Sequence, residues 1–231
     1  MRSILKSGVI GFTTMVALLL FSSCGKDATC TDGIQNGTET EIDCGGECGP
    51  CPTCDDGIKN GKETGIDCGG DCSRCYAIGD IGPGNGKVFY DKGNNNQGWR
   101  YLEAAPSDQE EAVDLSGDAN TKFVGNTSTA LGAGFENTDI ISKRIITFSS
   151  CAILKCRDLN FGGKTDWYLP SKDELLLMYQ KKSNIGQFTN GAYWSSSEVR
   201  AEDAWLVEFS NGDTYDELKT RKIRVRAIRR F

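Results

Sequence analysis

Two groups of four cysteines lie close together in the first third of this 231-residue chain. One group runs from Cys30 to Cys51 and the other from Cys54 to Cys75. In both groups the gaps between successive cysteines are thirteen, three and two residues, and the two segments are identical at 15 of 22 positions. Thiols at such spacing form disulfides or bind a metal ion. The spacing therefore indicates a tandem structural repeat whose chemistry depends on its cysteines.

Each copy of the repeat is too short to bury a hydrophobic core of its own. Four cysteines per copy predict two disulfides per copy, each worth about 2–4 kcal/mol, and three connectivities are open in each. The Asp-Gly, Asn-Gly and Gly-Gly pairs predict tight turns, because glycine supplies positive φ. We expect a small disulfide-rich stem of two repeats, residues 30–53 and 54–75, closed by Cys30, Cys44, Cys48, Cys51, Cys54, Cys68, Cys72 and Cys75.

Metal binding is the alternative use of these repeats. Zinc prefers cysteine ligands in reducing compartments, which disfavours it in an exported protein. Calcium prefers clustered oxygen ligands, and both copies carry the same oxygen-bearing side chains, although not at EF-hand spacing. We expect a spacer that is held together by disulfides and binds no cofactor. The alternative is a calcium site in each copy, with the ligands Asp32, Asn36, Glu39, Asp43, Asp56, Asn60, Glu63 and Asp67.

Cys24 follows a segment with the pattern of a secretory signal. Arg2 and Lys6 make its start basic, and the apolar run Val9–Phe21 is shorter than the ~20 residues that a membrane-spanning helix needs. Small residues precede Cys24, and this arrangement resembles the lipobox of bacterial lipoproteins. We therefore expect a signal peptide at residues 1–23, a lipidated Cys24 and a tether at residues 24–29. The protein would then be anchored to the outer membrane in the cell envelope and exposed at the surface.

Two further cysteines, Cys151 and Cys156, lie in the second half of the chain. In one continuous helix they would be separated by about 7.5 Å of rise, which is too far for an easy bridge. A helix that begins or kinks near residues 149–150 would bring them closer. Because the compartment is oxidising, we expect a disulfide between Cys151 and Cys156.

The chain contains no histidine. This excludes triads that use a histidine base and zinc sites with histidine ligands, so we expect a protein that is not an enzyme. The net charge of −6 makes nucleic acid an unsuitable partner. Charge is nevertheless uneven, because no acid follows Glu217 whereas seven bases do: Lys219, Arg221, Lys222, Arg224, Arg226, Arg229 and Arg230.

Residues 76–231 have the composition of one larger domain. Apolar spacing predicts helices within 138–159, with a break near 147–150, and a third helix that begins at Ser171 with Glu174 as its capping-box partner. Alternating patterns predict strands at 87–91, 99–104, 192–196, 204–209 and 222–228, and a long polar loop at 107–135. Two to three helices with short antiparallel strands indicate an α+β fold.

The last predicted strand offers a binding surface. Lys222, Arg224 and Arg226 alternate with apolar residues, so they should lie on one face and bind an anionic partner through charge-assisted hydrogen bonds. The alternatives are a solvated edge strand and ion pairs within the domain. The tryptophans offer a sugar-stacking platform, but aromatic residues in strands are more often core, so we expect core positions for Trp99, Trp167, Trp194 and Trp205.

Several motifs of this domain occur in a characteristic order: IGDIGPGNGKVFY, GWRYLEAAPSD, CRDLNFGGKTDWYLPSKDEL, YWSSSE, AWLVEFSNG and VRAIRR. The segment from about Tyr76 to Phe231 closely resembles the C-terminal domain family of the collagen-like protein Lcl. The resemblance implies a compact C-type-lectin-like fold and attachment to extracellular surfaces, since the founding member is an adhesin domain that binds sulfated glycans. That founding assembly is a trimer formed through a collagen-like stalk, which is missing from this sequence.

Together these features predict a lipid-anchored, non-catalytic envelope protein. Its large domain would recognise a glycan, anionic or sulfated, or an extracellular protein. The alternative is a structural or protein-interaction component of the envelope. The number of chains in the assembly is left open by the sequence.

Overall fold

The computed structural model describes residues 30–119, 125–145 and 150–231. The predicted signal peptide, Cys24 and the tether lie outside these residues. The chain divides into two compact units, one ending at Cys51 and the other beginning at Pro52. The second repeat therefore belongs to the same unit as the large domain, although the sequence suggested a boundary after Cys75. In the described part of the chain, no helix has both the length and the apolar character needed to cross a bilayer.

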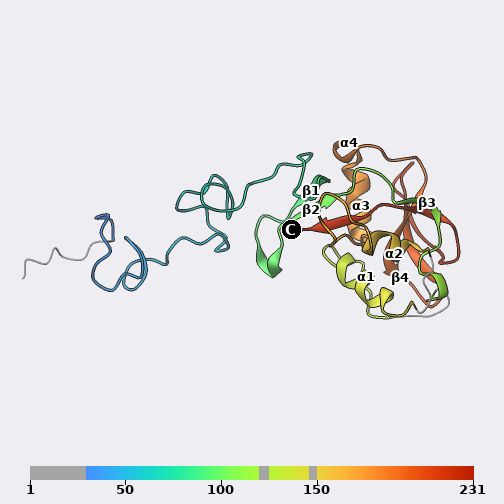
Figure 1. The fold of residues 1–231 in the computed structure, drawn as a ribbon, viewed down its shortest axis with the longest axis horizontal. Coiled ribbons are helices and arrows are strands. Elements are labelled where there is room, and N and C mark those ends of the chain that lie inside the picture. Colours follow the sequence, from blue (N-terminus) through green and yellow to red (C-terminus); the bar gives the residue numbers. More distant parts are fainter. Residues whose placement is uncertain (1–29, 120–124, 146–149) are drawn as a thin grey trace, which may run out of the picture. The chain divides into compact units, whose positions relative to one another are not determined.

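The second unit contains four helices and eight strands in its described residues (Figure 1). Two 3₁₀ turns, Asn96–Gly98 and Gly117–Ala119, complete the regular structure. The strands and helices in chain order are β1 Lys87–Asp91, β2 Tyr101–Ala104, β3 Glu110–Val113, α1 Gly134–Ser142, α2 Ala152–Arg157, α3 Lys172–Gln180, α4 Lys182–Ile185, β4 Ala192–Glu198, β5 Asp203–Glu208, β6 Thr214–Leu218, β7 Ile223–Val225 and β8 Ile228–Arg230.

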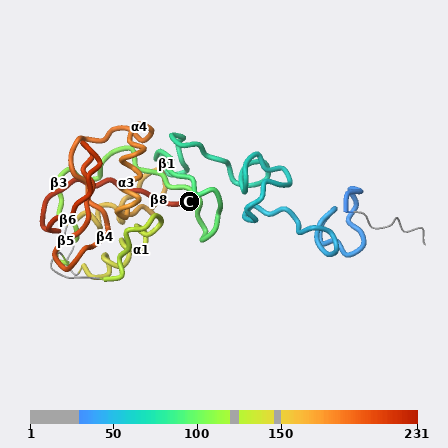
Figure 2. The backbone as a smooth tube through the Cα atoms, turned by 180° about the vertical axis from the view of Figure 1, so that it is seen from behind, coloured from blue at the N-terminus to red at the C-terminus, as the bar shows by residue number. Residues whose placement is uncertain are grey.

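The strands form two sheets, which confirms the α+β class. The smaller sheet has the antiparallel order β1-β2-β8, and the larger has the order β3-β7-β4-β5-β6. All pairs in the larger sheet are antiparallel except β4 with β7, which run parallel. Figure 2 shows β4, β5 and β6 close together at the left of the large domain. The last two strands, β7 and β8, thus belong to different sheets.

The strand predictions from the sequence were incomplete in three places. The predicted strand at 222–228 is two strands, because the chain leaves the larger sheet after Val225 and enters the smaller sheet at Ile228. The predicted loop at 107–135 contains β3, and β6 was not predicted at all. Both missed strands lie at the edges of the larger sheet, and most of their residues are not buried. Strands of this kind lack the apolar alternation that sequence patterns detect.

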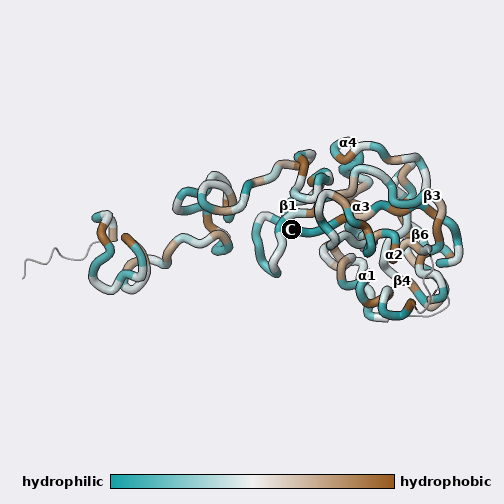
Figure 3. Tube along the Cα trace, in the orientation of Figure 1, coloured by the Kyte–Doolittle hydropathy of each residue, from teal (hydrophilic) through white to brown (hydrophobic). Residues whose placement is uncertain are grey.

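The larger sheet is covered on both faces by hydrophobic side chains. Neighbouring residues of a strand point to opposite faces, and here Trp194 and Leu206 belong to one apolar cluster whereas Tyr193 and Val207 belong to the other. Figure 3 shows short hydrophobic and hydrophilic stretches following one another along the large domain. Three of the four tryptophans are buried as expected, whereas Trp205 is partly exposed, with Lys172 Nζ 4.4 Å from the centre of its ring.

Helix α3 begins directly after Ser171, as predicted from the sequence. The main-chain N–H of Glu174 donates to Oγ of Ser171, and the main-chain N–H of Ser171 donates to Oε2 of Glu174. This reciprocal pair is the predicted capping box. The predicted break between the two preceding helices includes residues 146–149, which lie outside the described part, and α1 and α2 lie on either side of it.

Each repeat contains two disulfides with the same connectivity. Cys30 bonds to Cys48 and Cys44 to Cys51, and in the second copy Cys54 bonds to Cys72 and Cys68 to Cys75. The first cysteine thus pairs with the third and the second with the fourth. The prediction of two disulfides per copy is confirmed, and one of three open connectivities is selected.

The predicted disulfide between Cys151 and Cys156 is wrong, because no bond joins the two sulfur atoms. Cys151 has extended backbone angles and precedes α2, and Cys156 lies in the last turn of that helix. Five residues of mostly helical rise, about 7.5 Å, hold their backbones too far apart for easy bridging. Both side chains are buried in the core. Burial raises the pKa of the Cys156 thiol, and Cys151 adds to this effect.

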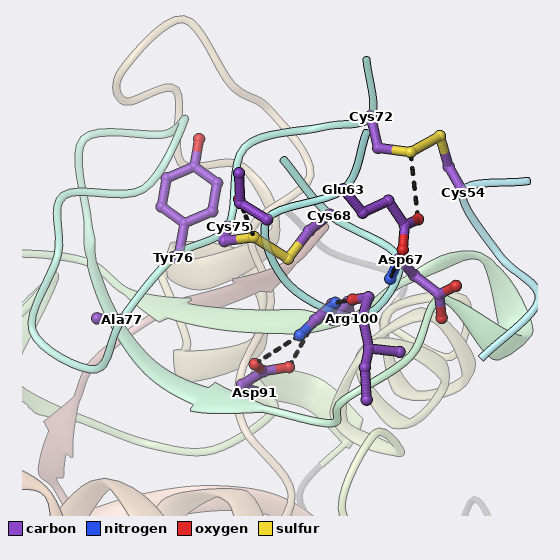
Figure 4. The surroundings of a disulfide bond; sticks show 12 residues. Cys54, Glu63, Asp67, Cys68, Cys72, Cys75, Tyr76, Ala77, Asp91 and Arg100 are labelled. Atoms are coloured by element: carbon purple, nitrogen blue, oxygen red, sulfur yellow. Dashed lines mark hydrogen bonds and ion pairs between the residues drawn. A yellow bond between two sulfur atoms is a disulfide. The ribbon is translucent and has the colours of Figure 1, made fainter. Parts of the chain in front are cut away.

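The second repeat is attached to the large domain through Arg100. Its guanidinium binds both carboxylate oxygens of Asp91, at 2.7 and 3.0 Å, and also donates to the main-chain oxygen of Ile66 in the repeat. Figure 4 shows Arg100 between Asp91 and the Cys68–Cys75 disulfide. Close by, the Tyr76 ring packs edge-on against those of Tyr101 and Phe231. The repeat is therefore fixed to the smaller sheet by side chains of β1 and of the segment that enters β2.

Candidate functional site

The predicted basic surface does not exist as one face. Lys222 is exposed, and its Nζ lies 2.6 Å from Oδ2 of Asp114. Arg224 is partly buried, and Arg226 is only 1% exposed. The assignment of Arg226 as a ligand-binding residue is therefore wrong. The physical reason is the crossing between sheets, because the alternation of a continuous strand stops at Val225.

Arg226 instead forms the centre of a buried polar cluster. Its Nε donates to Oδ1 of Asp108 at 2.7 Å, and its two other nitrogens donate to the main-chain oxygens of Gly186 and Gln187. Tyr193 donates its hydroxyl to Oδ2 of Asp108 at 2.8 Å. Burial, reinforced by Asp108, raises the pKa of Tyr193 to about 12, so this hydroxyl remains a donor at neutral pH.

Most of the basic C-terminal residues have acidic partners inside the domain. Lys219 and Glu198 form a buried pair at 2.6 Å, and Arg229 lies 2.5 Å from Glu103 and 2.7 Å from Asp166. Arg230 pairs with Glu136, and Arg221 lies 3.8 Å from Glu217. Within the described residues, Arg224 is the exception, with no ion pair or hydrogen bond from its side chain. The positive charge of the C-terminal segment is thus largely neutralised by acidic residues of the same domain.

A hollow in the described surface lies beside α2. It has a volume of about 570 Å³, and we call it the helix-edge pocket. One wall is the segment that follows β2, and the other is formed by α2 and the residues after it. Its lining is Ala105, Pro106, Ser107, Asp108, Gln109, Ser150, Leu154, Lys155, Asp158, Leu159, Asn160 and Phe161.

The helix-edge pocket combines apolar and hydrogen-bonding surface. Phe161 and the two leucines supply the apolar part, and the Phe161 ring is held against Trp167, with 6.1 Å between ring centres. Gln109 is fixed by hydrogen bonds to the main chain of Ser107 and Ala227. Ser107 and Asn160 are exposed at the rim. Hydroxyl and amide groups beside an aromatic ring can bind the polar edge and the apolar face of a small ligand.

Sequence reasoning did not identify this pocket, although a signal was present. Eight of its twelve lining residues come from motifs already noted, the end of GWRYLEAAPSD at 98–108 and the start of CRDLNFGGKTDWYLPSKDEL at 156–175. Neither motif contains a residue pattern of known chemistry. Only their meeting in space makes a concave site.

The carboxylates proposed as calcium ligands have other partners in both repeats. In the first copy, Asp43 accepts hydrogen bonds from the main-chain N–H groups of Asp32 and Gly33, at 2.8 and 2.9 Å. Glu39 accepts from the N–H of Asn36, and Asp32 accepts from the N–H of Ile34 and from the amide of Asn36. These bonds hold the turns together, so the carboxylates have a structural role with or without an ion.

The second copy has the corresponding hydrogen bonds between carboxylates and turns. Asp67 accepts from the N–H of Gly57, Glu63 from that of Asn60, and Asp56 from that of Ile58 and from the Asn60 amide. The amide of Asn60 and the main chain lower the pKa of Asp56. The described clusters of three ligand-type residues all include cysteines that are bonded in disulfides, so their sulfur atoms are not zinc ligands. Calcium binding stays a prediction.

Comparison with known proteins identifies the large domain. The family model of the Lcl C-terminal domain matches residues 107–229, just over half of the chain. No match was found among curated proteins. Among solved structures, a fimbrial protein from Bacteroides ovatus ATCC 8483 is similar, with 15% sequence identity and a TM-score of 0.40. The similarity covers 56% of this chain and 35% of the fimbrial protein, so the chain spans about a third of its length. Because this family model matches more than half of its residues, the chain belongs to the Lcl C-terminal domain family.

Proposed function

We propose that the protein is a non-catalytic binding module of the bacterial cell envelope, with a lectin-like large domain that binds glycans. Cys24 would carry the lipid that anchors it to the outer membrane. The family match supports a surface role for the large domain. The disulfides of the repeats support an oxidising, extracytoplasmic compartment.

The observation that carries glycan binding is the helix-edge pocket. Ligand pockets have volumes of about 300–1,000 Å³, and 570 Å³ is in that range. A sugar ring presents hydroxyls at its edge and C–H groups on its face, which suits the hydroxyl of Ser107, the amide of Asn160 and the ring of Phe161. The two carboxylates of the lining, Asp108 and Asp158, are held by Arg226 and Arg157. This arrangement favours binding over proton transfer.

A second function is favoured by one observation, the edge strand β6. Tyr215 and Leu218 on this strand are 43% and 48% exposed. An exposed edge strand with apolar side chains can pair with a strand of another protein. The protein would then be a structural or protein-interaction component of the envelope.

The two functions are separated by a glycan array probed with the detergent-solubilised full-length protein. Glycan binding predicts array signals that fall at least fivefold in Ser107→Ala/Asn160→Ala, because these exposed groups line the pocket without supporting the fold. Asn184→Ala is the matched control, since Asn184 is exposed on α4 outside the pocket. An array without signal, or equal signal in both variants, would reject the pocket as the glycan site.

A further inference from the structure

Arg224 is the one basic residue of the C-terminal segment without a partner among the described residues. Its Nε is shielded from solvent and has no hydrogen-bond acceptor. A buried donor without an acceptor lowers the stability of the fold. Folding removes its hydrogen bonds to water and provides no hydrogen bond in exchange. A leucine or methionine at this position would avoid that cost. The presence of arginine therefore needs a reason beyond folding.

The surroundings of Arg224 supply that reason. Residues of all five strands of the larger sheet line a hollow of about 250 Å³, which we call the sheet-face pocket. Tyr215 and Glu217 come from β6, Glu208 from β5, Glu111 from β3, and Arg224 from β7. This pocket shares no lining residue with the helix-edge pocket.

The backbone beside Arg224 leaves room for its guanidinium. Gly191 precedes β4, and a Cβ built on it would lie 2.9 Å from Nη1 of Arg224. Any side chain at position 191 would thus press against the guanidinium. The glycine lets the planar group lie against the main chain beside the sheet-face pocket.

The charges of the sheet-face pocket select a class of ligand. A guanidinium binds a carboxylate through two parallel hydrogen bonds. Glu111, Glu208 and Glu217 would repel a polyanion, but their oxygens can accept hydrogen bonds from ligand hydroxyls. The exposed Tyr215 offers a flat apolar surface. A small hydroxylated ring with a single carboxylate fits all three features.

We propose that the sheet-face pocket is a second binding site, which takes a sugar with one carboxylate and binds that carboxylate through Arg224. The ligand class is that of uronic and sialic acids, as free sugars or as glycan ends. Lys222 and Arg221 contribute less, because Asp114 and Glu217 already lie close to them. The proposal goes beyond glycan binding at the helix-edge pocket and does not depend on it.

The test uses the detergent-solubilised full-length protein, with amide chemical shifts recorded during titration. Glucuronate and N-acetylneuraminate are the carboxylated probes, glucose is the neutral control, and heparin is the polyanion. Glucuronate or N-acetylneuraminate should shift the amides of Gly191, Tyr215 and Arg224, whereas glucose should not. Binding restricted to one of the two acids identifies the sugar and supports the site. No shift with either acid, or stronger binding of heparin at these residues, overturns the proposal.

Arg224→Met decides whether the arginine serves binding or folding. We expect at least a tenfold loss of affinity for the carboxylated sugar, together with a melting temperature that is unchanged or higher. Arg224→Lys keeps the charge but not the planar pair of donors, so it should bind more weakly than the wild type. Arg144→Met is the matched control, because Arg144 is exposed in the turn that follows α1. A lower melting temperature with unchanged affinity would make Arg224 structural. Ser107→Ala/Asn160→Ala should bind the acids normally, which keeps the two sites distinguishable.

Discussion

Arg226 and Asp108, 118 positions apart in the sequence, meet in the core with 2.7 Å between Nε and Oδ1. Tyr193 from β4 donates to the second oxygen of the same carboxylate. The pair thus joins the crossing between β7 and β8 to the segment after β2. A residue that looks like part of a basic surface in the sequence is a structural anchor in the fold.

We expect Arg226→Met to lower the free energy of unfolding by about 3–5 kcal/mol, because it leaves Asp108 without its buried partner. Lys222→Gln is the matched control, since Lys222 is exposed and its pair with Asp114 should be worth about 1 kcal/mol or less. Denaturant unfolding of both variants measures the difference. Equal losses in the two would contradict a structural role specific to Arg226.

Glu174 predicts a pH dependence of stability. It is buried, and its carboxylate accepts from the N–H groups of Ser171, Gly132 and Gly134 and from the hydroxyl of Tyr168. Burial is the largest influence and raises the pKa of Glu174 to about 7, although the hydrogen bonds oppose it. The folded protein therefore binds this proton more tightly than the unfolded chain does. The resulting stability is fully present below about pH 4.5 and is lost as pH rises through about 7.

The size of this effect is about 3 kcal/mol, because each pKa unit corresponds to ~1.4 kcal/mol. Unfolding free energies measured from pH 4.5 to 8 should fall more steeply in the wild type than in Glu174→Gln, which cannot ionise. Parallel curves would show that the hydrogen bonds to Glu174 outweigh its burial. Asp173→Asn, on the same helix but partly exposed, controls for general charge effects.

The second repeat should depend on its disulfides for attachment to the large domain. Cys68→Ser/Cys75→Ser removes the bond next to Ile66, whose main-chain oxygen accepts from Arg100. We expect faster hydrogen exchange in residues 54–75 and around Arg100, and little change in the larger sheet. Cys44→Ser/Cys51→Ser is the matched control, because that disulfide belongs to the other compact unit. Unchanged exchange at Arg100 in the first variant would show that the contact does not need the disulfide.

Cys24→Ser should abolish lipid anchoring. The residue follows a short apolar run and small residues, as in a lipobox. Wild-type protein should partition into detergent and carry the mass of acyl chains on Cys24, whereas the variant should be unprocessed or released. Wild-type protein in the aqueous phase with an unmodified mass would refute the anchor.

Local features of this protein are determined by the sequence itself. The capping box of Ser171 and Glu174 was predictable because its partners are three residues apart and interact within one turn. The two disulfides of each repeat were predictable from cysteine count and the lack of a core. The central strands β4 and β5 were predictable from their short apolar runs, Ala192–Trp194 and Ala204–Val207.

Tertiary structure decided what depends on distant partners. The connectivity of each cysteine quartet depends on how the turns fold, since all three pairings are equivalent in sequence. The division of residues 222–228 between two sheets depends on which strands pair with them. That division buries Arg226 beside Asp108 and leaves Arg224 in a pocket on the sheet. The physical reason is that alternation along a strand sets only which side chains share a face, whereas the chain packed against that face sets their burial and partners.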